Sequence, residues 1–115
     1  MSRAAQGLRA WLLQRFTAIY LALYLLSMGL LMLLHGPWSY AQWRAWMGSP
    51  WTGVSTMIFA LALLLHAWVG VRDVLIDYLH AVWLRLLLMA LTALLLLGSL
   101  LWTLRALLLA AIGTP

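Results

Sequence analysis

Three long runs without Asp, Glu, Lys or Arg dominate the hydrophobic pattern of this chain. They cover residues 16–34, 52–71 and 86–104. Each run is close to the roughly 20 residues that an α-helix needs to cross a hydrocarbon core of about 30 Å. The pattern therefore predicts an all-α membrane protein with three transmembrane helices at about 16–34, 52–71 and 86–104.

The composition supports a membrane protein and limits its size. The chain has 115 residues, of which 67% are hydrophobic and 8% charged, and the three spans leave no room for a separate soluble domain. We therefore predict a single membrane domain over residues 1–115. The first run is longer than the apolar core of a signal peptide and lacks a small-residue cleavage site, so it is read as a helix that is retained. The chain has no cysteine, which excludes an iron–sulfur cluster held by this chain.

The net charge of +5 comes from arginines spread singly along the membrane borders, so it indicates topology and not nucleic-acid binding. Five of them flank one side of the predicted spans and two flank the other: Arg3, Arg9, Arg15, Arg72 and Arg85 against Arg44 and Arg105. By the positive-inside rule, the N-terminus faces the cytoplasm and the C-terminus faces the opposite side.

Two segments outside the spans are expected to lie at the membrane borders. Residues 2–14 carry leucines and a tryptophan between arginines, which suits a short amphipathic stretch on the cytoplasmic surface or against a partner protein. Residues 35–50 are bracketed by glycine–proline turn signals and hold several tryptophans, which predicts an interfacial anchor.

His66 is the one ionisable side chain in an otherwise uncharged stretch of residues 45–71. Ionisable groups are expensive in a bilayer and are functional candidates by default. Ala62 and Gly70, four residues to either side, leave the same helix face nearly bare, so a flat macrocycle such as haem would fit there. In the alternative interpretation, His66 hydrogen-bonds across a helix interface and the small residues only allow close packing.

A ligand count follows from the positions of the three histidines. A six-coordinate haem b needs two axial ligands. His35 lies at the opposite border, and His80 is about 21 Å along a helix from His66. If His66 binds haem, the second ligand must come from another polypeptide, so the protein would be half of a heteromeric cytochrome or of a symmetric dimer.

Both carboxylates of the chain follow the second predicted span. If that helix continues past the membrane border, Asp73 and Asp77 share a stripe with His66, and Asp77 lies roughly 16 Å from it. The spacing favours a solvated Asp73 paired with an arginine, Arg72 or Arg85. It leaves open whether Asp77 and the adjacent Tyr78 belong to a functional site or only to the membrane border.

The motif formed by His66, Ala67, Trp68 and Gly70, followed by Asp77 and Tyr78, closely resembles the small hydrophobic membrane-anchor subunit of bacterial succinate dehydrogenase. The segment Arg15-Phe16-Thr17-Ala18 at the start of the first span extends this resemblance, which covers nearly the whole chain in length, layout and orientation. His80-Ala81 departs from the basic residue and proline common in relatives. The implied fold is half of a heterodimeric haem-binding helical bundle.

The resemblance also implies roles for four residues. His66 would be an axial ligand of haem b, with the other ligand from the larger anchor protein, the cytochrome b subunit. Tyr78 would hydrogen-bond ubiquinone at a site shared with the cytochrome b and iron–sulfur subunits, and Asp77 would support that site. Arg15 would lie near the haem propionates, since a guanidinium suits a carboxylate at the membrane border.

The implied function is anchoring of succinate dehydrogenase, complex II, in the bacterial inner membrane. Electrons from succinate would arrive through the flavoprotein and iron–sulfur subunits, so this chain would not oxidise succinate itself. The alternatives are an anchor of another membrane cytochrome b, a haem-less fumarate reductase anchor, or a structural protein without a cofactor.

Overall fold

A computed structural model of the chain describes residues 3–112, with side chains from residue 7 onward. It contains four helices: α1 (Arg3–His35), α2 (Tyr40–Gly48), α3 (Pro50–Tyr78) and α4 (Val82–Ile112). No strand occurs within residues 3–112. Three of the helices are long and apolar enough to cross a membrane, over Gly7–His35, Pro50–Tyr78 and Val82–Ile112. The prediction of an all-α protein with three transmembrane helices is confirmed.

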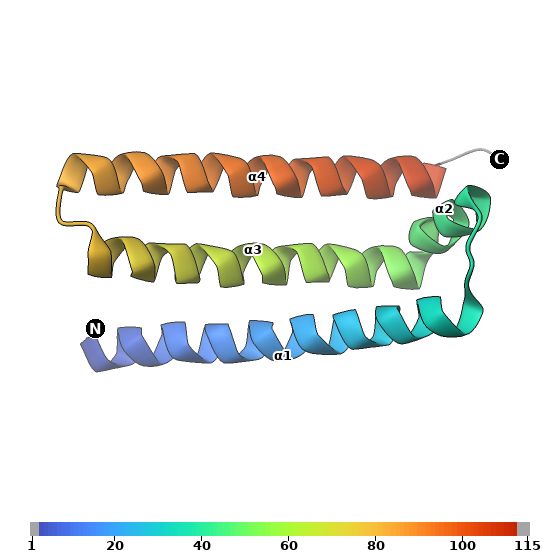
Figure 1. Ribbon diagram of the computed structural model, residues 1–115, viewed down its shortest axis with the longest axis horizontal. Helices are drawn as coiled ribbons and strands as arrows, with labels where there is room; N and C mark the ends of the chain where they lie inside the picture. The colour runs from blue at the N-terminus through green and yellow to red at the C-terminus, as the bar shows by residue number, and fades with distance from the viewer. Residues whose placement is uncertain (1–2, 113–115) are drawn as a thin grey trace.

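The three long helices form an open row with α3 in the middle (Figure 1). Helix α3 packs against α1 on one side and α4 on the other, whereas α1 and α4 do not contact each other within residues 3–112. The start of α1, the end of α3 and the start of α4 lie at one end of the row, and α2 lies at the other end against α4 and α3. Because the outer helices do not meet, the row leaves wide apolar faces exposed.

The helices extend well beyond the apolar runs. Helix α1 has 33 residues and is therefore about 50 Å long, more than a hydrocarbon core of about 30 Å. Its first turns include residues 3–14, which therefore continue the first transmembrane helix without a break; Ser2 lies outside the described residues. Whether this stretch contacts the membrane surface or a partner protein stays a prediction. No residue between 3 and 35 breaks the helix, because the arginines and leucines there are good helix formers.

The loop after α1 contains helix α2, which has a capping box at its start. Ser39 N–H donates to Gln42 Oε1 at 2.9 Å, and Gln42 N–H donates to Ser39 Oγ at 3.1 Å. At the end of α2, a methyl group at Gly48 would collide with the backbone of Ala110 in α4. Arg44 Nη2 donates to Leu109 O at 3.2 Å, one of the last carbonyls of α4, which have no partner within the helix.

The interface between α1 and α3 contains small residues and hydroxyl groups beside the stacked rings of Tyr24 and Phe59. Tyr20 Oη donates to Ser55 O at 2.7 Å, and Tyr24 Oη lies 2.6 Å from Thr56 Oγ1. The buried residues of the described chain are small or of medium size: Thr17, Thr52, Thr56, Ala60, Ala62 and Val69. Such residues let transmembrane helices approach closely and bond through their polar groups. These contacts set the rotation of α1 against α3, and with it the surroundings of His66.

Candidate functional site

His66 lies in the middle of α3 and faces α1. Its ring is half-buried, and Nδ1 is 3.0 Å from the Thr17 hydroxyl oxygen across the helix interface. Thr17 is buried, with 7% of its surface exposed. The structure therefore places one hydroxyl group of α1 against one nitrogen of the imidazole.

The small residues around His66 also lie at helix interfaces. Ala62 is 8% exposed, and a methyl group at Gly70 would lie 3.8 Å from Gln14 Nε2. The interpretation in which His66 hydrogen-bonds across a helix interface beside close-packed small residues is thus confirmed as geometry. The contact to Thr17 uses only Nδ1 of the ring. Within residues 7–112, no group hydrogen-bonds the other ring nitrogen, His66 Nε2. An imidazole that hydrogen-bonds an oxygen through one nitrogen and leaves the other nitrogen without a hydrogen bond has the arrangement of a haem ligand.

The other two histidines are remote from His66. His35 ends α1, 18 residues or about 27 Å along the helix from Thr17. His80 lies in the turn after α3, at the other end of the row. Residues 3–112 contain no group of three potential metal ligands. Of the described histidines, therefore, only His66 could ligate a haem iron in this region.

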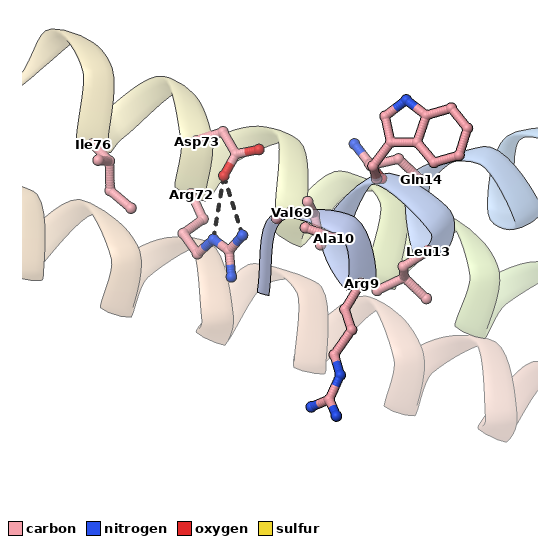
Figure 2. Close-up of a pocket in the computed structure, with 10 residues that line it drawn as sticks. Arg9, Ala10, Leu13, Gln14, Val69, Arg72, Asp73 and Ile76 are labelled. Carbon is pink, nitrogen blue, oxygen red and sulfur yellow. Dashed lines mark hydrogen bonds and ion pairs between the residues drawn. The ribbon is translucent and has the colours of Figure 1, made fainter. Parts of the chain in front are cut away.

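A cleft of about 870 Å³ opens between the start of α1 and the end of α3. Figure 2 shows the cleft with Arg9 on α1 and Arg72 and Asp73 on α3. Arg72 Nη2 lies 3.2 Å from Asp73 Oδ1, which confirms the interpretation of Asp73 as an arginine-paired surface carboxylate. Gln14 Oε1, which is buried at the inner end, has no hydrogen-bond partner among the described residues. The cleft therefore combines a charged mouth with one buried, unpaired amide oxygen.

Asp77 and Tyr78 lie at the end of α3, which continues to Tyr78 as the predicted stripe requires. Asp77 is exposed, and Tyr78 is 75% exposed. Neither residue lines the cleft. Tyr78 is 12 residues, or about 18 Å along the helix, from His66. The structure therefore does not bring them together with His66, and both side chains are exposed at the end of α3.

Arg15 lies on a different face of α1 from the His66 contact. Its guanidinium is 5.2 Å from the centre of the Trp11 ring. Because two residues correspond to about 200° of helix rotation, Arg15 projects roughly opposite to Thr17. The structure thus does not bring Arg15 to His66, and its predicted role at a propionate stays a prediction.

Two polar contacts of the site are not predicted by the sequence pattern. The first contact involves Thr17, which carries the only hydroxyl group of the segment Arg15-Phe16-Thr17-Ala18. A hydroxyl group in an apolar span was the one sign of a hydrogen bond between helices, since polar side chains in lipid commonly hydrogen-bond across helix interfaces. The second contact involves Arg85, which the sequence offers as a partner for Asp73. Instead its Nη2 donates to Leu79 O at 2.7 Å. This bond closes the turn beside Tyr78.

Comparison with known proteins identifies a family and a similar protein. The family described as the succinate dehydrogenase/fumarate reductase transmembrane subunit matches residues 1–101. The chain is also similar to a protein of Coxiella burnetii named succinate dehydrogenase hydrophobic membrane anchor subunit, with 35% identity over 97 residues. That alignment covers 84% of this chain and 84% of the relative, so the similarity extends over most of both proteins.

Proposed function

This chain belongs to the succinate dehydrogenase/fumarate reductase transmembrane subunit family, and we propose that it anchors succinate dehydrogenase while co-ligating haem b and contributing to a ubiquinone-reduction site. The Coxiella burnetii relative bears the name of such an anchor, and three apolar helices suit that role. As an anchor subunit, the chain is not catalytic alone. Its partners are the flavoprotein, iron–sulfur and cytochrome b subunits of the complex.

The haem part of this proposal rests on His66. An ionisable side chain inside an apolar span is a functional candidate, and Nε2 has no hydrogen-bond partner among residues 7–112. His66 would hold the iron on one side, and the cytochrome b subunit would supply the second ligand. Arg15, which is exposed and directly follows the cleft residue Gln14 in α1, would pair with a propionate. When bound, haem b supplies a one-electron carrier within the membrane.

The quinone part of this proposal rests on the end of α3. Reducing ubiquinone takes two electrons and two protons, and the protons must come from water. Tyr78 carries a phenol hydroxyl that can donate a hydrogen bond, and it is exposed at the helix end. Its hydroxyl would donate to a quinone carbonyl, with Asp77 beside it as a polar group in contact with solvent. The bond from Arg85 to Leu79 O would hold this turn in place.

Purifying the complex through a tag on this chain tests the function. We expect a flavoprotein, an iron–sulfur protein and a second b-type subunit to co-purify, with a low-spin b-type spectrum. A flavoprotein without haem would instead indicate a fumarate reductase type of anchor, and haem without a flavoprotein would indicate another cytochrome b. Recovery of neither would contradict both parts of the proposal.

We expect the N-terminus to face the cytoplasm and the C-terminus the periplasm. Three spans place the termini on opposite sides, and five of seven arginines flank the N-terminal side. Alkaline phosphatase fused after Pro115, which lies outside the described residues, should be active, and a green fluorescent protein fusion there should be dark. As a control, fusions after His80 should show the reverse. Swapped signals would put Tyr78 on the side away from the proposed iron–sulfur partner.

A further inference from the structure

Thr17 makes a chain of hydrogen bonds that reaches His66. Its hydroxyl oxygen is 2.7 Å from Leu13 O, 3.2 Å from Gln14 O and 3.0 Å from His66 Nδ1. A hydroxyl has one proton to donate, whereas a backbone carbonyl only accepts. The short contact to Leu13 O is the usual bond of a helical threonine to the carbonyl four residues earlier. The Thr17 proton therefore goes to Leu13.

This donor assignment decides which nitrogen of His66 carries a proton. We infer from the shorter contact to Leu13 O that the Thr17 hydroxyl donates there, so that its oxygen accepts a hydrogen bond from Nδ1. A neutral imidazole has one N–H. In a neutral ring this assignment places the proton on Nδ1 and leaves the lone pair of Nε2 free.

We propose that Thr17 is a positioning residue that holds His66 in the Nδ1–H tautomer and presents Nε2 to a metal ion. This inference rests on the proposed function, because the metal ion is the iron of haem b. Metal-bound histidines commonly donate their other N–H to an oxygen, which orients the ring and makes it a stronger ligand. Here the acceptor belongs to the same chain as the ligand, so the orientation is present before any partner binds.

The surroundings of Thr17 suit such a role. Thr17 is buried, so no bulk water competes for the bond to His66. Two further bonds tie α1 to α3 on the same interface, from Tyr20 to Ser55 and between Tyr24 and Thr56. They keep the two helices from rotating against each other. A hydroxyl held on a neighbouring helix in this way fixes the plane of the imidazole more firmly than a mobile surface group would.

Thr17→Val in the assembled complex tests the inference, since valine keeps the shape and removes the acceptor. We expect the midpoint potential of haem b to shift in the positive direction, because a hydrogen bond from Nδ1–H to an oxygen strengthens the ligand and favours ferric iron. The g-values of the low-spin ferric haem should shift too. Thr17→Ser retains the hydroxyl and should restore both properties to near wild type.

Thr56→Val is the matched control. It also removes a buried hydroxyl from the α1–α3 interface, where Thr56 bonds Tyr24, but it leaves His66 untouched. It should therefore assemble like Thr17→Val and leave the potential unchanged. An equal shift in both variants would mean that general loosening of the interface causes the effect, and would overturn the inference.

The remaining outcomes also decide the question. An unchanged potential and unchanged g-values in assembled Thr17→Val would contradict the inference. Should that variant fail to assemble, Thr17→Ala provides the same test with a smaller side chain. If both Thr17 variants fail to assemble while Thr56→Val assembles, a role of Thr17 confined to positioning is contradicted. If instead a His66 variant leaves the haem unchanged, haem ligation by this chain is wrong, which is a separate failure from that of Thr17.

Discussion

Replacing His66 with leucine is expected to remove the low-spin b-type haem spectrum from the purified complex. Leucine has nearly the size of histidine and suits an apolar span, so α3 should still form. Under the proposed ligation, however, the variant would lack one of the two iron ligands and would retain only the ligand from the cytochrome b subunit. The haem should then be lost or become high-spin. The measurement is the haem-to-flavin ratio by pyridine haemochrome, together with the optical and electron paramagnetic resonance spectra.

His35→Leu provides the matched control for this experiment. It removes the same chemical group from α1, at the end of the row remote from His66, and should leave the haem spectrum unchanged. If His66→Leu leaves the haem content, spectrum and potential all unaltered, His66 serves only the helix interface through Thr17. The anchor function would survive that result, but haem ligation by this chain would not.

Replacing Tyr78 with phenylalanine is expected to lower succinate:ubiquinone reductase activity by roughly 10- to 100-fold. The change removes one hydroxyl and keeps the ring. A hydrogen bond to a group that gains charge is worth about 1.5–3 kcal/mol, and about 1.4 kcal/mol corresponds to a tenfold change in rate. Because the proposed bond would strengthen as negative charge develops on the quinone oxygen, kcat should fall more than KM rises.

Two readouts separate this effect from damage to the complex. Succinate oxidation by a soluble dye that accepts electrons upstream of the quinone should persist in Tyr78→Phe, as should the haem spectrum. Tyr40→Phe is the control, since Tyr40 is exposed to the same extent as Tyr78, at 75%, but lies in α2 at the opposite end. If quinone reduction is unchanged, Tyr78 is only a border residue. A joint fall of both activities with loss of assembled complex would make its role structural.

The three spans were predictable from the sequence because the bilayer imposes a simple length requirement on apolar runs. The runs at 16–34, 52–71 and 86–104 all lie within the observed helices α1, α3 and α4. The family was also recognisable, since the motif from His66 to Tyr78 is local in the sequence. The family match confirms the family. His66 was identifiable for a related reason: an ionisable residue in an apolar run is visible in the sequence without knowledge of its contacts.

Helix boundaries outside the hydrocarbon were harder to predict. The bilayer requirement ends at the membrane border, so it gave no reason to join residues 3–14 to the first span, although their helix propensity favours the continuous α1. The capping box of Ser39 and Gln42 was a readable signal for α2, yet the tryptophans around it directed the interpretation to an interfacial anchor alone.

By itself, the sequence determined the number and position of the spans, the isolation of His66 and the family. Only the tertiary structure decided that α3 lies in the middle, that Thr17 meets His66 and that Arg85 bonds Leu79. The physical reason is that lipid is as apolar as leucine, so hydrophobicity does not favour one face of a transmembrane helix over another. Rotation and register between helices are set instead by a few small and polar contacts, and these pair residues as far apart in the chain as Thr17 and His66.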